Sequence, residues 1–186
     1  YTSNAGLKEL RKEICRYLER KIGVSYDPKK ETLVTVGGSE AVDIGLRCML
    51  DPGDEVLLPQ PSYVSYLPCT VMADGVPVII PLKNENEFKL TVEELEEHMT
   101  PKTKVLIMPF PNNPTGSIMT REDLEPIAEF VKENDLYVIS DEIYSELTYG
   151  TEHVSIASLP GMRERTIVIN GFSKGFAMTG WLSLIH

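Results

Sequence analysis

The first segment of the chain has the pattern of an amphipathic helix. Between residues 7 and 22, apolar side chains recur every three or four positions, at Leu7, Leu10, Ile14, Leu18 and Ile22. Because an α-helix completes a turn in about 3.6 residues, this spacing puts them on one stripe. We therefore expect a helix over residues 7–22 that packs against a larger body.

Short apolar runs and helical patterns alternate along the rest of the chain. Apolar runs predict strands at 33–36, 56–58, 76–80, 105–108, 136–139 and 167–169, and helical spacing predicts helices at 41–50, from about residue 63, and at 121–134. The runs are nearly continuous, as in parallel strands that are covered on both faces. The alternation predicts an α/β fold, a three-layer α/β/α arrangement with a mainly parallel sheet, whose ligands bind beyond the carboxyl ends of the strands.

Size, charge and cysteine content narrow the classes of protein. The 186 residues, 42% hydrophobic and 25% charged, suit a single globular domain spanning 1–186. No apolar run reaches the ~18 residues that cross a bilayer, and the net charge of -10 disfavours nucleic acids and anionic membranes. Three cysteines without a C-x-x-C pair indicate neither a disulfide framework nor a metal site, and they favour reduced thiols in a cytoplasmic protein.

A glycine-containing segment follows the first predicted strand. Gly37, Gly38 and Ser39 come directly after the run 33–36 and open a helical pattern. Free backbone N–H groups at a helix N-terminus can bind a phosphate, and glycines let the anion approach the backbone. An ordinary strand-to-helix turn with Ser39 as the N-cap explains the same residues.

Two titratable residues and an amide follow later strands. Asp141 ends the run that begins at residue 136, where a buried carboxylate needs a cationic or hydrogen-bonding partner; it can equally cap a following helix. Lys174 follows the run 167–169, where its neighbours can make the amine nucleophilic; a solvated surface lysine is the alternative. Asn113 lies in a turn after 105–108 that either aims an amide into the site or is only a turn.

Five segments, taken together and in order, resemble the class I/II aminotransferases of fold type I. They are Gly37-Gly38-Ser39-Glu40-Ala41, Pro61-Ser62-Tyr63, Asn113-Pro114-Thr115-Gly116, Ser140-Asp141-Glu142-Ile143-Tyr144 and the run from Ser173 to Trp181. The resemblance extends from Tyr1 to Trp181. It implies the large cofactor-binding domain of this family, with pyridoxal 5'-phosphate (PLP) as the cofactor.

The resemblance also implies roles for individual residues. Lys174 holds the cofactor as an imine and acts as general base and acid, and Asp141 pairs with the pyridine nitrogen so that the ring accepts electrons. Asn113 and Tyr144 hydrogen-bond the phenolic oxygen of the cofactor, and Tyr63 stacks on its ring. Lys174, Asp141 and Tyr144 are therefore the expected catalytic residues.

A phosphate cup and a second subunit follow from the same resemblance. Gly38, Ser39 and Ser173 match the residues that hold the phosphate, and Tyr1 resembles the tyrosine that reaches the phosphate of a neighbouring subunit, which implies a homodimer. The family has an arginine eight residues after the lysine, where this chain has Leu182, so we expect weaker cofactor retention. We also expect the amino-terminal arm and the small carboxyl-terminal domain of the family to be missing.

The implied reaction is transamination between an amino acid and a 2-oxo acid. Two alternatives remain: a PLP-dependent C–S β-lyase on the same fold, because the bond that is cleaved depends on how the substrate is oriented, and a non-catalytic module that binds PLP and dimerises. A nucleotide-binding domain is less favoured, since Gly37-Gly38-Ser39 does not form a G-x-G-x-x-G motif.

Overall fold

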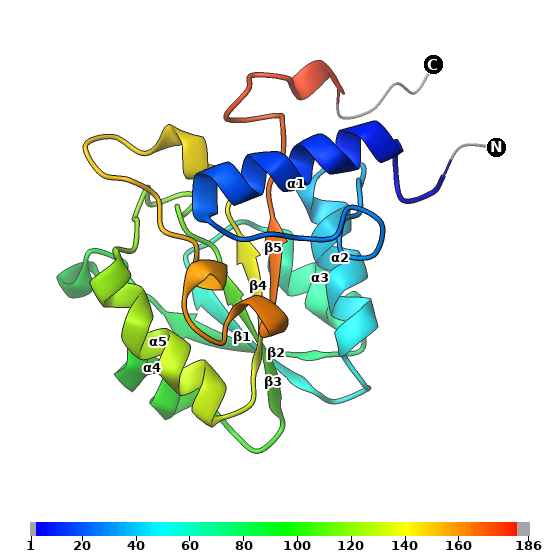
Figure 1. Ribbon diagram of the computed structural model, residues 1–186. Helices are drawn as coiled ribbons and strands as arrows, with labels where there is room; N and C mark the ends of the chain where they lie inside the picture. Colours follow the sequence, from blue (N-terminus) through cyan, green and yellow to red (C-terminus); the bar gives the residue numbers. More distant parts are fainter. Residues whose placement is uncertain (1–2, 182–186) are drawn as a thin grey trace.

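The computed structural model of the chain describes residues 3–181 and is built around a sheet of five parallel strands (Figure 1). The strand order is β2-β1-β3-β4-β5, with β1 at Glu55–Gln60, β2 at Val76–Pro81, β3 at Thr103–Met108, β4 at Tyr137–Asp141 and β5 at Thr166–Ile169. The interiors of β1, β3 and β4 are continuously buried, which confirms the parallel sheet predicted from the unbroken apolar runs. The roles expected for Tyr1 and Leu182 fall on residues outside the described range.

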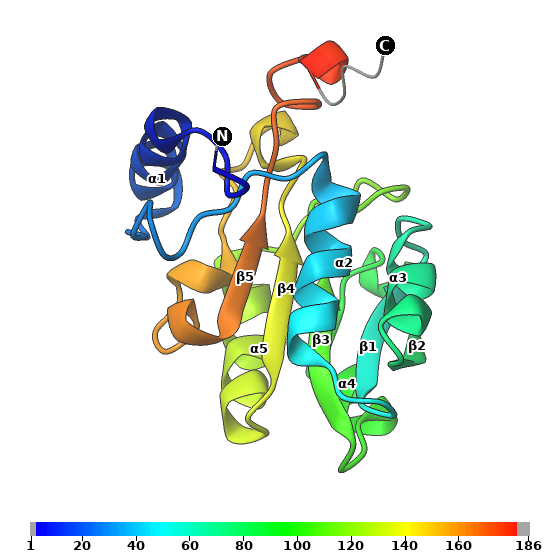
Figure 2. The same ribbon diagram turned by 90° about the vertical axis from the view of Figure 1, so that its right-hand side faces the viewer.

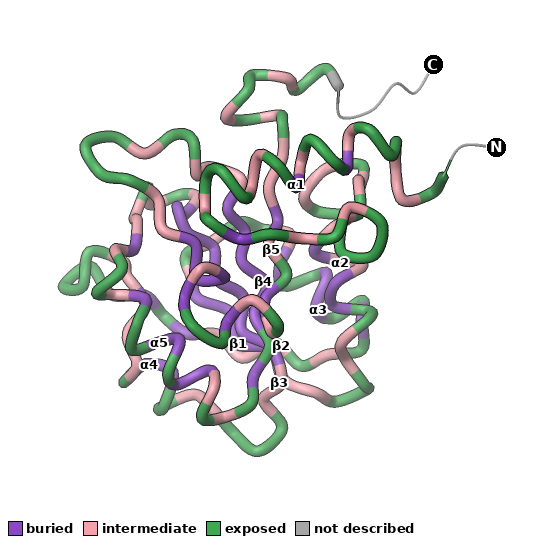
Figure 3. The backbone as a smooth tube through the Cα atoms, in the orientation of Figure 1, coloured by how far each residue is buried: buried purple, intermediate pink, exposed green. Residues whose placement is uncertain are grey.

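Helices cover both faces of the sheet, which confirms the three-layer arrangement (Figure 2). One face carries α2 (Gly38–Met49) and α3 (Tyr66–Met72), and the other carries α4 (Val92–His98) and α5 (Arg121–Glu133). Successive side chains of β3 alternate between the layers: Leu106 belongs to the core beneath α4 and α5, whereas Val105 and Ile107 belong to the core beneath α2 and α3. Buried residues therefore concentrate in the strands and on the helix faces toward them (Figure 3).

The amino-terminal helix, α1 (Lys8–Ile22), lies beside the carboxyl end of β5 rather than on the middle of the sheet (Figures 1 and 2). It confirms the predicted helix and ends at Gly23, whose φ of 70° is the left-handed conformation that glycine adopts readily. Its apolar stripe is only partly buried, because the helix packs at the margin of the fold. Within residues 3–181, no helix is long and apolar enough to cross a bilayer.

The strand predicted at 33–36 is wrong. Residues 32–35 have no regular secondary structure and pair with no strand of the described chain. The N–H of Val34 donates to the carbonyl of Ala5 at 3.1 Å, which fixes the segment to the residues before α1. The side chains of Leu33 and Val36 are 50% and 61% exposed. An apolar run becomes a strand only where a neighbouring strand offers hydrogen bonds, and this run lies away from the sheet.

The short segments that complete the fold are 3-10 turns. They are η1 (Asn84–Asn86), η2 (Ser145–Leu147), η3 (Ile156–Ser158), η4 (Arg163–Arg165) and η5 (Thr179–Trp181). Of these, η2 matters most for the site, because it follows β4 within a few residues.

Candidate active site

Residues from four separate segments meet at the carboxyl edge of the sheet. Asp141 is the last residue of β4, Tyr144 follows it in a turn, and Lys174 lies in the loop after β5. Tyr63 lies in the loop between β1 and α3, and Ser39 lies in the first turn of α2. Because all five strands are parallel, the segments after β1, β4 and β5 emerge on the same side of the sheet, where ligands bind in such folds, and the contact of Ser39 with Tyr63 places the first turn of α2 there as well.

Asp141 is a buried carboxylate with two donors. Its Oδ2 accepts a hydrogen bond from the hydroxyl of Tyr66 at 2.7 Å, and its Oδ1 accepts one from the N–H of Ile143 at 3.2 Å. Burial raises the pKa of Asp141; the two hydrogen bonds oppose that rise, and the neighbouring Glu142 adds to it. Among the described residues no lysine, arginine or histidine forms an ion pair with this carboxylate.

The alternative prediction, that Asp141 caps a following helix, is wrong, because no α-helix begins there. Residues 142–144 form a turn that leads into η2, and the Oδ1 contact with Ile143 closes only this turn. Tyr66, the first residue of α3 and three residues beyond Tyr63, was not singled out from the sequence. Only the packing of α3 against the sheet carries its hydroxyl to the end of β4, so spacing along the chain could not reveal the contact.

Tyr66→Phe is expected to lower the free energy of unfolding by about 1–3 kcal/mol, because it leaves a buried carboxylate oxygen without its donor. The loss is expected to be larger at about pH 8 than at about pH 5, since the hydroxyl stabilises the charged form of Asp141. Urea unfolding at the two pH values measures the effect. Tyr137→Phe, which changes a tyrosine at the exposed start of β4, is the matched control; equal losses for both variants would contradict the prediction.

Three hydroxyl groups gather between α2 and α3. The Ser39 hydroxyl donates to the Tyr63 hydroxyl at 3.5 Å and lies 3.4 Å from Ser65 Oγ. Hydrogen bonds from Ser39 and then Ser65 lower the pKa of Tyr63; Lys174 lowers it further and Asp141 raises it, so both charges act at this hydroxyl. Ser65 is a second residue that sequence reasoning missed.

Helix α2 begins two residues earlier than it would if Ser39 were its N-cap, so the alternative with Ser39 as the N-cap is wrong. Gly37 is the N-cap of α2 with a φ of 82°, a conformation that disfavours other residues, and no side chain caps the helix. Gly38 and Ser39 then occupy the first turn, whose N–H groups point out of the helix. A Cβ on Gly38 would meet only Ile169, at an ordinary 3.6 Å, so Gly37 is the glycine that the backbone requires.

Lys174 is exposed in the loop after β5 and faces Tyr144. Its Nζ lies 5.9 Å from the centroid of the Tyr144 ring. The carbonyl of Lys174 accepts a hydrogen bond from the N–H of Ala177 at 3.0 Å, which closes a turn around the lysine. Ser173 precedes it in the same loop and is partly exposed. The amine is therefore accessible to a ligand bound at this edge.

Asn112 and Asn113 are adjacent, but only Asn112 uses its side chain in hydrogen bonds within the described residues. Asn112 is buried; its Nδ2 donates to the carbonyl of Pro61 at 3.2 Å, and its Oδ1 accepts from the backbone and the hydroxyl of Thr115 at 3.2 and 3.0 Å. It holds the turn in shape. The side chain of Asn113 makes no hydrogen bond to another residue between 3 and 181, so its amide remains available for a ligand.

A second buried carboxylate, Glu142, lies directly after Asp141. Glu142 accepts hydrogen bonds from the hydroxyls of Ser140 and Ser155 at 2.9 and 2.6 Å, and its Oε2 lies 2.9 Å from His153 Nε2. These contacts tie the loop 148–155 to the end of β4. The network was also not foreseen, because its members come together only through this loop.

Comparison with known proteins identifies the family. The sequence model described as aminotransferase class I and II matches residues 1–182. The chain belongs to the class I and II aminotransferase family. As a member of this family it is 51% identical over 181 residues to the putative aminotransferase YugH of Bacillus subtilis, and 52% identical over 182 residues to an aspartate aminotransferase of Pyrococcus abyssi.

The fold agrees with solved aminotransferases. A crystal structure of an aromatic aminotransferase from Pyrococcus horikoshii matches with a TM-score of 0.95 and 51% sequence identity, covering 97% of this chain and 48% of that one. The two sequence relatives are likewise matched over 97% of this chain and 47% of their own length. This aminotransferase-family chain therefore spans about half the length of the relatives it matches.

Class I and II aminotransferases use PLP, and the sheet edge of this family member fits that group. Asp141 is a buried carboxylate that lacks a cation among the described residues, and a protonated pyridine nitrogen would provide one. The uncapped first turn of α2, with the hydroxyls of Ser39 and Ser65 beside it, suits a phosphate. Lys174 presents an amine at the same edge, where an aldehyde can reach it.

Proposed function

We propose that the protein moves an amino group between an amino acid and a 2-oxo acid with PLP as its cofactor. The observation that carries this proposal is the meeting of Lys174, Asp141 and Tyr144 at one edge of a parallel sheet in a chain of the aminotransferase family. When bound, PLP supplies an electron sink for the pair of electrons released at the substrate's α-carbon. Relatives that are aspartate and aromatic-amino-acid aminotransferases support the same reaction class.

Three residues of the chain would carry the chemistry. Nζ of Lys174 would hold the cofactor covalently until the amino group of the substrate replaces it there; the freed amine would then take the proton from the α-carbon and return it, so that one amine would act as nucleophile, base and acid in turn. The carboxylate of Asp141 holds a proton on the pyridine nitrogen, supported by its charge and its fixed hydrogen bonds to Tyr66 and Ile143. The hydroxyl of Tyr144 donates to the phenolic oxygen of the cofactor.

The remaining predicted residues would bind and orient. The side chain of Asn113, free of partners within residues 3–181, also donates to the phenolic oxygen, and Tyr63 stacks on the ring. Gly38, Ser39 and Ser173 hold the phosphate with the N–H groups of α2. We further propose that residues 1–186 form one cofactor-binding domain of a cytoplasmic homodimer, in which Tyr1 reaches the phosphate of the neighbouring subunit.

A half-reaction tests the proposed reaction. The purified chain is loaded with PLP, mixed with single amino acids, and followed by absorbance while the products are identified. We expect at least one amino acid to convert the aldehyde form of the cofactor to its amine form, with stoichiometric release of the matching 2-oxo acid. Lys102→Ala, which removes an exposed lysine just before the amino end of β3, should behave as the parent.

Two other outcomes would replace the proposal. Release of pyruvate and ammonia from a sulfur amino acid, with the cofactor unchanged, would favour a β-lyase. Bound PLP that responds to no amino acid would favour a module that binds the cofactor without turnover.

A further inference from the structure

The loop that carries Lys174 has no regular structure of its own. The hydrogen bonds between backbone groups of residues 170–178 are internal: the N–H of Ala177 donates to the carbonyl of Lys174 at 3.0 Å, and the N–H of Met178 donates to the carbonyl of Phe172 at 3.1 Å. These bonds shape the loop but do not attach it to the body. The place of the lysine therefore depends on what the loop packs against.

The loop packs on the segment that directly follows Asp141. A Cβ on Gly175 would lie 2.9 Å from the Cβ of Glu146, and a Cβ on Gly171 would lie 2.7 Å from the Cδ1 of Ile143. Both glycines thus bring the loop backbone onto side chains of residues 143–146. Asn170 adds a hydrogen bond from its Nδ2 to Ser145 Oγ at 3.1 Å. Residues 143–146 therefore fix the position of Lys174 relative to β4.

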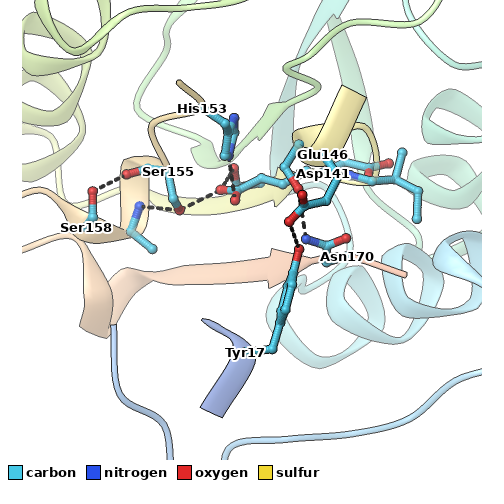
Figure 4. Close-up of polar contacts among 12 residues, drawn as sticks. Tyr17, Asp141, Glu146, His153, Ser155, Ser158 and Asn170 are labelled. Carbon is cyan, nitrogen blue, oxygen red and sulfur yellow. Dashed lines mark hydrogen bonds and ion pairs between the residues drawn. The ribbon is translucent and has the colours of Figure 1, made fainter. Parts of the chain in front are cut away.

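Two side chains of helix α1 contact the same segment. The hydroxyl of Tyr17 donates to Oε1 of Glu146 (Figure 4), and Lys21 Nζ lies 2.9 Å from the same carboxylate. The hydrogen bond from Tyr17 and then that from Lys21 lower the pKa of Glu146, which keeps the acceptor charged. Burial, followed by Glu146, raises the pKa of Tyr17, which keeps the donor protonated. The contact is thus a charge-assisted hydrogen bond at neutral pH.

Tyr17 also contacts the loop itself. Its ring lies edge-on to Phe176 with 5.8 Å between the centroids, and Phe176 in turn lies 5.7 Å from Phe172. One side chain of α1 therefore makes two different contacts, a hydrogen bond to the segment beneath the loop and an aromatic contact to the loop. This explains why a helix with a half-buried stripe lies beside the end of β5.

We infer that Tyr17 is a positioning residue that holds the loop 170–178, and with it Lys174, against Glu146 and the end of β4. The inference concerns the placement of the loop, and it rests on the proposed function only in taking Lys174 as the amine that binds the cofactor. Tyr17 touches no reacting atom; it acts through Glu146 and Phe176.

Two substitutions separate the two contacts. Tyr17→Phe removes the hydroxyl and keeps the ring against Phe176, whereas Tyr17→Leu removes both. Tyr26→Phe is the matched control, because Tyr26 also packs near α1 but its buried hydroxyl has no hydrogen-bond partner among the described residues. Glu146→Ala removes the acceptor, and the double variant Tyr17→Phe/Glu146→Ala tests whether the hydroxyl acts through it.

The first readout needs no cofactor. Backbone amide exchange of Ala177 and Met178 is expected to rise by up to about ten-fold in Tyr17→Leu, the scale of one lost aromatic contact. Exchange in α5 and in the Tyr26→Phe control should stay as in the parent, which separates loosening of the loop from loss of global stability. Unchanged exchange of the loop in Tyr17→Leu would overturn the inference, whatever the chain does with PLP.

The second readout is covalent capture of PLP on Lys174, fixed with borohydride and timed by mass spectrometry. We expect Tyr17→Phe to slow capture by about ten-fold and Tyr17→Leu by up to about 100-fold, since a misplacement of about 1 Å can cost that much. In the Glu146→Ala background, Tyr17→Phe should add nothing. Parental capture rates in both Tyr17 variants would also overturn the inference and leave the proposed function intact. A loosened loop in a chain that captures no PLP at all would support the positioning role of Tyr17 and refute the proposed function.

Discussion

Replacing Lys174 with alanine is expected to abolish covalent capture of PLP and to reduce amino-group transfer by at least about 10²- to 10⁴-fold, the range attributed to a positioned acid or base. The reason is that the same amine is proposed to bind the cofactor and to move the proton. Borohydride fixation followed by peptide mass spectrometry locates the captured cofactor, and the half-reaction measures the transfer.

Two matched lysine variants show whether the effect belongs to this position. Lys174→Arg keeps a cation in the loop but cannot form the covalent bond, so it should fail in capture as alanine does. Lys21 is another amine near the loop, but its Nζ is 2.9 Å from the carboxylate of Glu146; Lys21→Ala should still capture PLP at Lys174. Cofactor fixed on any lysine of the Lys174→Ala variant, at the parental yield, would contradict the assignment.

Replacing Asp141 with asparagine is expected to leave the fold intact and to lower amino-group transfer by about 10²- to 10³-fold, the range for losing one electrostatic contact to developing charge. The amide can keep both hydrogen bonds, because its oxygen accepts from the N–H of Ile143 and its nitrogen donates to the hydroxyl of Tyr66. What it loses is the negative charge beside the pyridine nitrogen. Capture of PLP on Lys174 should persist, so a variant that captures and transfers at parental rates would refute the role.

The same substitution is expected to change the pH dependence of stability. Burial raises the pKa of Asp141 above its unfolded value of about 3.9, so the folded chain without cofactor holds that proton more tightly than the unfolded chain does. The contribution of protonated Asp141 to the free energy of unfolding is therefore fully present below the unfolded pKa, and it is lost as the pH rises through the folded pKa. Asp141→Asn lacks this loss, and its urea unfolding free energy should fall less over the same pH range. Asp141→Glu, which keeps the charge, should retain the parental slope.

Local pattern was sufficient for most of the fold. The strands β1 to β5 and the helices α1, α2 and α5 lie where apolar periodicity predicted them, because a strand covered on both faces needs an unbroken apolar run and an amphipathic helix needs a stripe. The exception at 33–36 shows the limit of that rule. Its apolar residues are as continuous as those of a strand, but pairing depends on a neighbour elsewhere in the chain.

The chemistry of single positions was also readable in advance. Asp141 at the end of a buried run and Lys174 after the last run could each be placed at one sheet edge from their order alone, whereas Gly37-Gly38-Ser39 follows no strand and only the packing of α2 places it there. Parallel strands send their carboxyl ends to the same side, so sequence order implies spatial proximity at that edge. The resemblance to a family then joined these residues around one cofactor.

Periodicity and strand direction were enough to predict the layers, the sheet edge and most of the residue types that gather there. The strand order and the partners of the functional groups emerged from tertiary packing: the hydroxyl of Tyr66 on Asp141, the hydroxyl of Ser65 beside Ser39, and the hydrogen bond from Tyr17 to Glu146. Tyr17 and Glu146 are separated by more than a hundred residues, and their contact depends on how α1 packs beside β5. No local pattern encodes such a contact, since it results from the packing of whole elements.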